Sequence, residues 1–589
     1  MTRRLRLPCL LLTALAAQLP SHAASIPQAA SDIEAGRRIY EEGVLADGRA
    51  LEATHAGGLR FAGGEAACVR CHRPSGMGGV EGDIQVQPIT GNALFGTGDR
   101  VIATMDPRSG KAFNLAHDPY TDAQVAQMLR SGTRPDGRAL NELMPHYELG
   151  ERDQAALLAY LRQLSVDWSP GVTTDTIHFA TVVTPDVPAA RRALFIDMAN
   201  RIVAQKNGST KVAGQGTRHH MTSAAELVLG TERRWTLDVW QLEGAPDTWP
   251  RQLDAYYARS PVFALVSGLG GAEWAPVDDF CDRQRLPCWF PSVALPPTAA
   301  PRYSLYFSAG PALEARVLAT SLLAAGARPP HQVIQLHDEG TVGAGAAQAL
   351  SASLRGSAIR VLDRVVARDD PQALARALAE AQADPDDTAL VLWFDPAQMA
   401  QLATLPAPRA QAYVSGTMAG GSASAVPAAW RDAVHVVYPY ELPEKRAANL
   451  AYFHAWLNQR HLPLVDEVMQ SEVYFAFAFL TDTVAEMLDN LHRDYLLERA
   501  ETMINRREGG RAESEYYSST MSHVRTRADE PAALHALRLA GSSFGVRAGT
   551  TIYPRLSLGP GQRFASKGAY LARIDDEGAI VADGAWITP

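Results

Sequence analysis

Apolar and polar positions follow three different patterns along the chain, and each pattern predicts a different kind of structure. One apolar run opens the sequence within residues 1–24. Residues 31–167 contain separate segments with helical periodicity. From residue 177 onward, short apolar runs alternate with Ala- and Leu-rich helical stretches. The intervening residues 168–176 combine Pro, Gly, Ser and Thr without an apolar period, so we expect a linker there.

The N-terminal pattern is typical of a secretory signal. Three arginines in MTRRLR precede the apolar run LPCLLLTALAA, which is too short to span a bilayer as a helix of the mature protein. Ser21 and Ala23 are small residues at the spacing that a signal peptidase recognises. We therefore expect residues 1–24 to be a cleaved signal peptide and the mature protein to be periplasmic. An N-terminal membrane anchor is the alternative.

The pattern after residue 177 predicts parallel sheets covered by helices. Strand-like runs such as IHFATVV, PVFALVSGL, HQVIQLHD and TALVLWFD are rich in Val, Leu and aromatic residues. Helical stretches such as PALEARVLATSLLAAG separate them, and this rhythm is typical of α/β layers. About 400 residues are too many for one such sheet, so we expect two lobes.

Composition and charge narrow the classes of partner. The chain has 589 residues, of which 47% are hydrophobic and 20% charged, as in ordinary globular proteins. Without the three leader arginines, 52 basic residues face 64 acidic ones, a net charge of −12. This balance argues against binding to nucleic acid or to an anionic membrane surface. No later apolar stretch reaches about 18 residues, so no membrane span is expected in the mature chain.

The stretch EAACVRCHRPSGMGG carries the most specific chemical signal. Cys68, Cys71 and His72 form a Cys-x-x-Cys-His motif, the attachment signature of c-type haem. Both thiols would form thioether bonds to one porphyrin, and His72 would be the proximal iron ligand. A redox dithiol, a zinc pair and a disulfide are the alternatives. A zinc site needs four ligands and a thioredoxin-type dithiol needs a βαβ context, and neither is evident nearby.

Methionines near the motif are candidates for the sixth iron ligand. Met77 lies in a Gly-rich turn only five residues after His72, and Met128 belongs to an apolar helical stripe. Met144 lies just before a helical segment, and the following Pro145 keeps it extended. We therefore expect Met144 to be the sixth ligand, with His146 as its main competitor.

Three segments together resemble a monohaem class I cytochrome c. They are SDIEAGRRIYEEGV, in which Ser31 and Glu34 form a capping box, CVRCH, and MPHYELGERDQAALLAYLRQL. The resemblance covers residues 31–167 and implies one covalent haem c in a small all-α domain. The family's first and last helices cross, so we expect this crossing to involve Gly36, Tyr40 and Tyr160.

One feature departs from that family. Tyr40 and Cys68 are 28 positions apart, more than in compact members, so GRALEATHAGGLRFAGG is expected to form a surface flap near the haem edge. Ligation by His and Met raises a haem's reduction potential relative to other ligand sets. With both axial positions filled, the implied role is one-electron transfer and not enzyme catalysis.

The order of strands and helices in residues 177–589 resembles type I periplasmic substrate-binding proteins, the fold of the branched-chain amino-acid receptors. The resemblance implies crossings between two lobes near residues 300 and 440, and a final hairpin in GAYLARIDDEGAIVADGAWI. Such lobes bind ligands at the C-terminal ends of their strands. Ser267, Gly268 and Ser308 follow strands and are candidates to bind a small polar or anionic ligand through backbone N–H groups. An ordinary turn is the alternative for each.

The segment FCDRQRLPCWFP contains the second cysteine pair. Cys281 and Cys288 are expected to form a disulfide, which suits an exported protein and would contribute about 2–3 kcal/mol at most. Two buried thiols are the alternative.

Two functions are compatible with these features. The first is a periplasmic c-type cytochrome, fused to a solute-binding module, that exchanges electrons with a redox partner such as a dehydrogenase. The second is a receptor of the ABC-transporter type in which the haem domain is accessory. A haem peroxidase would need an open iron position, which ligation by Met144 removes.

Overall fold

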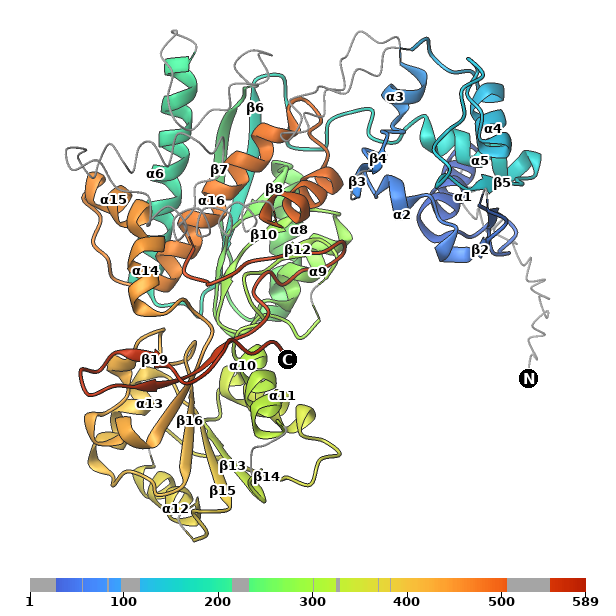
Figure 1. Cartoon of the computed structure of the whole chain (residues 1–589). Helices are drawn as coiled ribbons and strands as arrows, with labels where there is room; N and C mark the ends of the chain where they lie inside the picture. The colour runs from blue at the N-terminus through green and yellow to red at the C-terminus, as the bar shows by residue number, and fades with distance from the viewer. Residues whose placement is uncertain are drawn as a thin grey trace, which may run out of the picture. The chain divides into compact units, whose positions relative to one another are not determined.

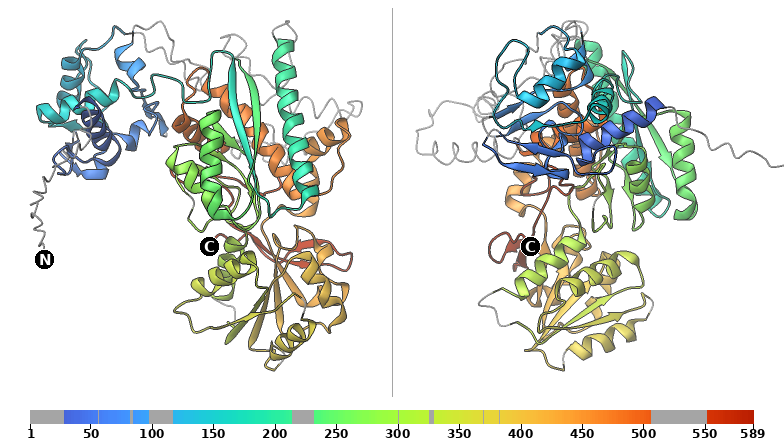
Figure 2. Two further views of the ribbon diagram at one scale, coloured as in Figure 1. Left: turned by 180° about the vertical axis from the view of Figure 1, so that it is seen from behind. Right: turned by 90° about the vertical axis from the view of Figure 1, so that its right-hand side faces the viewer.

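The computed structural model divides the chain into two units (Figures 1 and 2), and the signal peptide predicted at residues 1–24 lies outside the residues that it describes. The first unit contains the described residues before Gly98 together with His117–Val166, and the second begins at Asp167. The described residues are 28–55, 57–81, 84–96, 117–213, 232–299, 301–324, 329–368, 370–381, 383–505 and 551–589.

The first unit is built mainly from helices around one apolar core. Thr121 begins one of them with a capping box, in which its side chain and that of Gln124 satisfy each other's backbone N–H groups. Buried Ile39, Leu157 and Leu161 contribute to the core. The helices are α1 (Gln28–Glu42), α2 (Val69–His72), α3 (Gly91–Phe95), α4 (Asp122–Ser131) and α5 (Glu151–Leu161).

Helices α1 and α5 cross in close contact, as the sequence predicted. The crossing uses Gly36 because a Cβ atom there would lie 2.1 Å from the carbonyl oxygen of Ala156 and 2.7 Å from Cβ of Tyr160. Four residues further along α1, the ring of Tyr40 packs against that of Tyr160, with centroids 5.3 Å apart. The first and last helices of the unit can therefore approach this closely because Gly36 has no side chain.

Replacing Gly36 with alanine is expected to destabilise the first unit. The new methyl group would overlap a backbone carbonyl, so the helices must move apart at a cost of about 1–3 kcal/mol or more. Thermal unfolding followed by absorption of the haem domain would measure the change. Gly57→Ala is the matched control, since a Cβ atom there meets nothing within 4 Å. Equal melting temperatures for the two variants would contradict this account of the crossing.

The expectation of an all-α first unit is incomplete, because the expected flap contains strands. Strands β1 (Glu52–Thr54), β2 (Arg60–Ala62) and β5 (His146–Tyr147) form an antiparallel sheet in the order β2-β1-β5. A second hairpin joins β3 (Gly79–Glu81) to β4 (Ile84–Val86). The flap thus pairs with the residues that directly follow Met144, which extends the sheet to the segment expected to hold the iron.

The second unit contains two parallel sheets with the same strand order. In the first lobe, β7 lies beside β6, followed by β8, β10 and β12, so the strands run 2-1-3-4-5 in sequence order. The short strands β9 and β11 extend the sheet beside β6. The strands are β6 (Thr176–Val183), β7 (Arg234–Gln241), β8 (Ala264–Val266), β9 (Leu269–Gly270), β10 (Cys288–Trp289), β11 (Ser292–Val293) and β12 (Ser304–Leu305).

The second lobe repeats this arrangement and ends in the predicted hairpin. Its order is β14-β13-β15-β16-β17, again 2-1-3-4-5, and the antiparallel β18 and β19 complete the sheet. Helices α10 and α11 lie together along one side of it in Figure 1. The strands are β13 (Gln332–His337), β14 (Arg360–Val365), β15 (Thr388–Trp393), β16 (Gln411–Ser415), β17 (Val434–Tyr438), β18 (Tyr570–Ile574) and β19 (Ile580–Ala582).

Helices connect the parallel strands in both lobes, as parallel pairing requires. Residues 493–505 are also helical. The helices of this unit include α6 (Ala189–Ala213), α8 (Trp249–Arg259), α9 (Ala275–Arg283), α10 (Pro311–Leu322), α11 (Thr341–Ser353), α13 (Pro396–Gln401), α14 (Pro443–Asn449), α15 (Ala451–Gln459) and α16 (Glu467–Met487). Among the described residues, no helix is both long and apolar enough to cross a bilayer.

The chain passes between the lobes at three places. Two follow β12 and β17, close to the positions 300 and 440 that the sequence suggested. The third precedes β18 and pairs with the other two. Tyr306 N donates to the carbonyl oxygen of Arg563 at 2.8 Å, and Glu441 N donates to that of Ile552, also at 2.8 Å. The three crossing segments therefore form one hydrogen-bonded hinge.

Residues 168–176, predicted as a linker, are attached to the second unit. The indole Nε1 of Trp168 donates to the carbonyl oxygen of Asp489 at 2.9 Å, and Ser169 N donates to that of Leu491 at 3.0 Å. A Cβ atom at Gly171 would lie 2.2 Å from Phe263 N. The segment is held by hydrogen bonds of its backbone and of the Trp168 indole and does not depend on a periodic apolar face.

Candidate functional site

The haem-attachment motif lies on the single turn of α2. Cys68 is the residue before this turn, and the helical spacing brings Cys68 and Cys71 to the same side. Cys68 is buried and Cys71 is exposed, and the two are not joined in a disulfide bond. Burial raises the pKa of the Cys68 thiol to about 12. Within the described residues, no cluster of three or more His, Cys, Asp or Glu could hold a metal ion, so the zinc alternative has no ligand set there.

His72 is oriented for metal ligation through one ring nitrogen. Its imidazole is buried, and Nδ1 lies 3.1 Å from the carbonyl oxygen of Gln87. Burial lowers the pKa of His72 to about 4, so the ring is neutral at physiological pH. A neutral ring that donates Nδ1–H to this carbonyl presents its lone pair on Nε2. The residues therefore fit a c-type haem, with two thiols on one helical turn and an imidazole of fixed tautomer beside them.

Met144 occupies a turn at the edge of the first unit's core. Its backbone N–H donates to the carbonyl oxygen of Asn141 at 2.9 Å, and its half-buried side chain packs against the core. Met77 and Met128 are buried, the first in a tight turn and the second in α4. The positions of Met77 and Met128 follow the sequence expectation, whereas Met144 ends a turn and does not lie in an extended segment. Met144 stays the predicted sixth ligand.

His146, the competing ligand, contacts the end of α4. A Cβ atom at Gly132 would lie 2.4 Å from Nε2 of His146, so this ring nitrogen packs directly on the glycine that ends the helix. Gly132 has a φ of 63°, which favours glycine. This contact places Nε2 of His146 against the end of α4.

Tyr147 connects the segment of the predicted sixth ligand to the attachment motif. Its buried hydroxyl donates to the carbonyl oxygen of Ala66 at 3.0 Å, two residues before Cys68. Tyr147 also pairs with Ala53 of the flap in the β1–β5 register. Sequence reasoning missed this tyrosine and Gln87, because nothing in the spacing of either residue marks its partner.

A cleft of about 1590 Å³ lies in the second unit, bordered by both lobes and by the hinge. Asp186 follows β6, Asp338 follows β13, and Asp395 follows β15, and all three line the cleft. These strands flank the two points where strand order reverses, which is where open α/β sheets bind ligands. The cleft is therefore the candidate ligand site of this unit.

Of the three residues predicted to bind a ligand, one lines the cleft. Ser308 does so, with its hydroxyl oxygen accepting from Gly310 N at 3.1 Å. Ser267 and Gly268 are not among its lining residues. Ser267 N donates to the carbonyl oxygen of Trp289 at 2.7 Å, and the Gly268 carbonyl accepts from Ser292 N. Their backbone groups belong to the sheet, because the chain kinks between β8 and β9 and stays paired.

Arg191 and Arg368 line the cleft within ion pairs. Arg191 Nε lies 2.7 Å from a carboxylate oxygen of Asp466, at the start of α16. Arg368 bridges Asp338 at 2.6 Å and Asp395 at 2.7 Å. Both guanidinium groups are thus neutralised by acids of the same cleft.

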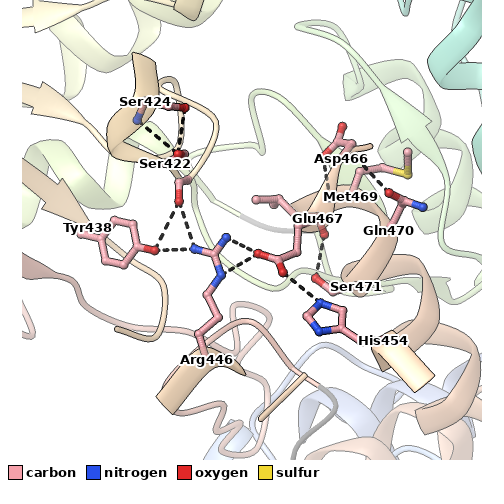
Figure 3. Close-up of polar contacts among 12 residues, drawn as sticks. Ser422, Ser424, Tyr438, Arg446, His454, Asp466, Glu467, Met469, Gln470 and Ser471 are labelled. Carbon is pink, nitrogen blue, oxygen red and sulfur yellow. Dashed lines mark hydrogen bonds and ion pairs between the residues drawn. The ribbon is translucent and has the colours of Figure 1, made fainter. Parts of the chain in front are cut away.

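Figure 3 shows that Arg446 is also paired. Its guanidinium bonds Glu467, with Nε 2.7 Å from Oε2, and donates to the Tyr438 hydroxyl at 2.5 Å. His454 Nε2 lies 3.0 Å from the other oxygen of Glu467. This network joins the end of β17 to α14, α15 and the first turn of α16, so it holds together one of the chain's crossings between lobes.

A buried carboxyl group and three aromatic rings meet where the cleft borders the hinge. Glu472 Oε1 accepts from the Tyr553 hydroxyl at 2.6 Å. The ring of Tyr553 stacks on that of Phe307, with centroids 5.6 Å apart, and contacts that of Tyr440 at 5.5 Å. All four residues line the cleft. Burial raises the pKa of Glu472 to about 7. Its hydrogen bonds lower the pKa, but their effect is smaller than that of burial.

A second buried glutamate lies outside the cleft lining. Glu314 of α10 is fully buried and accepts from Thr417 N at 2.9 Å. Burial raises its pKa to about 7 as well. Glu314 therefore resembles Glu472 in burial and titration without facing the same space.

Cys281 and Cys288 are joined by a disulfide bond, the pairing that the sequence suggested. It links α9 to β10, seven residues apart in sequence. Neither residue is among those that line the cleft.

Comparisons with known proteins give a family match in the first unit and similar solved structures for most of the chain. The family model described as cytochrome c matches residues 60–165. No curated protein sequence matches the chain significantly.

Solved structures similar to the chain are substrate-binding proteins. A fatty acid ABC transporter substrate-binding protein from Thermomonospora curvata is 14% identical, with a TM-score of 0.41 over 72% of this chain and 95% of its own. A possible leucine/isoleucine/valine-binding protein from Rhodopirellula baltica SH 1 is also 14% identical, with a TM-score of 0.43 over 71% of this chain and 98% of its own.

A branched chain amino acid ABC transporter from Thermus thermophilus with bound valine is 10% identical, with a TM-score of 0.44 over 71% of this chain and 98% of its own. These likenesses concern the fold, which the repeated strand order of the two lobes describes independently. Together with the motif at Cys68, Cys71 and His72, the family match identifies residues 60–165 as a cytochrome c domain.

Proposed function

We propose that the protein is a periplasmic c-type cytochrome that transfers single electrons and carries a solute-binding module on the same chain. The observation that carries the proposal is the orientation of His72. Its buried ring directs Nδ1 to the Gln87 carbonyl, which leaves Nε2 for the iron of a haem held by Cys68 and Cys71.

The bound haem would supply a one-electron redox centre. Cys68 and Cys71 would hold it covalently, and His72 and Met144 would fill both axial positions. A pair of protein ligands leaves no position for oxygen or peroxide, so we propose electron transfer and no enzymatic activity. The redox partner would be another periplasmic protein, such as a dehydrogenase.

The cleft supports the second part of the proposal. It lies at the strand ends where two-lobed α/β proteins take small ligands, and a hydrogen-bonded hinge connects its walls. This geometry also favours the alternative function, a receptor of the ABC-transporter type in which the haem is accessory. The two functions differ in whether ligand binding or electron transfer is the primary activity.

Absorption spectra and a potentiometric titration of the full chain test the cytochrome function. The protein would be expressed with its leader in a host that matures c-type cytochromes. We expect a covalently bound haem, one reversible one-electron step and no rapid binding of carbon monoxide by the reduced protein. Colourless protein would refute the haem assignment, and rapid carbon monoxide binding would instead support an enzyme with an open iron position.

A further inference from the structure

The charged groups of the cleft determine what kind of ligand it can accept. Six acids and three arginines line it, which leaves a net charge of −3. Each arginine is paired with a lining acid: Arg191 with Asp466, Arg368 with Asp338 and Asp395, and Arg446 with Glu467. A ligand carboxylate would have to displace one of these internal partners before it could bind an arginine.

Backbone N–H groups at the strand ends are also occupied by the protein's own acids. In the first lobe, Asp186 accepts from Ala272 N at 3.2 Å, and a Cβ atom at Gly271 would lie 1.9 Å from the same carboxylate. In the second lobe, Asp338 accepts from Gly340 N at 3.0 Å, and Asp395 accepts from Gln398 N at 2.9 Å. These amides would otherwise attract an anion. Both lobes therefore present negative charge at the positions where an acid would bind.

Glu472 lies beside aromatic rings in this negative cleft. Its side chain is 93% buried, and it shares the hinge end of the cleft with Phe307, Tyr440 and Tyr553. Aromatic rings near a carboxyl group favour ammonium groups, because the ring faces attract cations and the carboxylate compensates the charge. Ser292 and Ser308 add hydroxyl groups that can orient a polar ligand.

We propose that the cleft binds a small organic cation, an amine or quaternary ammonium compound, with Glu472 as its counter-ion. This inference rests on the proposed solute-binding function and specifies its ligand class. A cation would contact Glu472 and the rings of Tyr440 and Tyr553, whereas the paired arginines would provide no site for an acid.

The titration of Glu472 provides an independent measurement. The Glu472 carboxyl has a pKa of about 7 in the unliganded protein, so it is mostly ionised at pH 8 and mostly protonated at pH 6. A cation needs the ionised form. Its affinity should therefore fall about tenfold from pH 8 to pH 6. The groups that face Glu472 are Ser292 of β11, Arg191 of α6, Asp466 before α16, and the hinge residues Tyr440 and Tyr553.

Calorimetric titration of the haem-loaded full chain tests the ligand class with probes matched in shape. Choline is compared with its uncharged isostere 3,3-dimethylbutan-1-ol. Phenethylamine is compared with 2-phenylethanol and with phenylacetate. We expect the cations to bind at least tenfold more tightly than the matched neutral probes, and phenylacetate to bind most weakly. Choline does not titrate, so any change in its affinity between pH 8 and pH 6 reports the protein.

Two variants separate the role of Glu472 from a general effect of burial. Glu472→Gln should weaken choline binding on the order of 10- to 100-fold, because a buried charged contact is lost. Glu314→Gln removes a glutamate of similar burial and pKa that does not line the cleft but acts on the rings of Tyr440 and Tyr553, so it should weaken choline binding less than Glu472→Gln does. If Glu472→Gln fails to fold, the pH series on Glu314→Gln gives the same information, because that variant removes the other glutamate whose pKa is raised to about 7.

The outcomes distinguish this inference from the function on which it rests. Tighter binding of phenylacetate or of the neutral probes, or choline affinity that Glu472→Gln leaves intact, would refute the cation and preserve a solute-binding module. Choline affinity that does not change between pH 8 and pH 6 would refute the role of Glu472 as the counter-ion and preserve a solute-binding module. No heat from any probe would overturn the inference and leave the solute-binding function to be tested with other classes of solute, and the spectroscopic test of the haem would be unaffected.

Discussion

Replacing Met144 with alanine is expected to lower the reduction potential by on the order of 100 mV or more, because axial ligands set haem potentials over a span of roughly 0.8 V. The half-buried thioether at the edge of the core would be lost, and with it the predicted second protein ligand. Potentiometric titration measures the shift. The weak near-infrared band of sulfur-to-iron ligation should disappear, and the reduced variant should bind carbon monoxide.

The control variants are chosen from the other methionines and the competing histidine. Met77→Leu and Met128→Leu remove buried sulfur atoms elsewhere in the unit, so both should keep the near-infrared band. His146→Gln should keep it as well, since Nε2 of His146 packs on Gly132. If Met144→Ala left the band and the potential unchanged, the ligand assignment would be wrong. Loss of either property in one of the other three variants would identify the true ligand.

The sequence predicted the parts of the first unit that depend on local spacing. The attachment motif follows from three residues within five positions. The crossing of the first and last helices was implied by the resemblance to cytochrome c, and Gly36, Tyr40 and Tyr160 do form it. The partner of His72 could not be predicted, because any carbonyl at the right place in space can accept from Nδ1. Gln87 does so from a position 15 residues away.

The flap illustrates why the all-α expectation was incomplete. Its length showed that extra structure precedes the motif, but β1 and β2 have three residues each, too few for a periodic signal. They are strands because they pair with each other and because β1 also pairs with β5, which lies about 90 residues further along the chain. Long-range pairing of this kind has no signature in the local pattern.

In the second unit, too, the pattern of strands and helices was predictable from the sequence, whereas the location of individual residues was not. Alternating strands and helices, together with the chain's length, predicted two α/β lobes, and the resemblance to substrate-binding proteins implied two of the three crossings. The third crossing was missed because it consists of extended segments without an apolar period. Ser308 lines the cleft, whereas Ser267 and Gly268 do not, since a kink keeps their backbone groups in the sheet. The aspartates that occupy the strand ends look like ordinary loop acids in the sequence.

Replacing Arg493 with methionine is expected to destabilise the second unit by about 3–5 kcal/mol, because removing the buried charge leaves its hydrogen-bond acceptors without a donor. The guanidinium is 6% exposed and donates to the carbonyl oxygens of Val262 at 2.5 Å, Gln284 at 3.1 Å and Pro170 at 3.2 Å. It also donates to that of Phe263 and to the Tyr257 hydroxyl. Methionine fills similar space but leaves the carbonyls without donors. Chemical unfolding of the second unit measures the loss.

Lysine and surface controls show which property of Arg493 matters. Arg493→Lys keeps the charge but loses the planar set of donors, so its loss of stability should fall between those of the wild type and Arg493→Met. Arg251→Met, at an exposed position of α8, should change stability by less than about 0.5 kcal/mol. Because Pro170 lies in the predicted linker, Arg493→Met should also expose residues 168–176 to proteolysis before global unfolding. An unchanged cleavage pattern with normal stability would show that backbone contacts alone, such as that of Ser169 with Leu491, hold this segment.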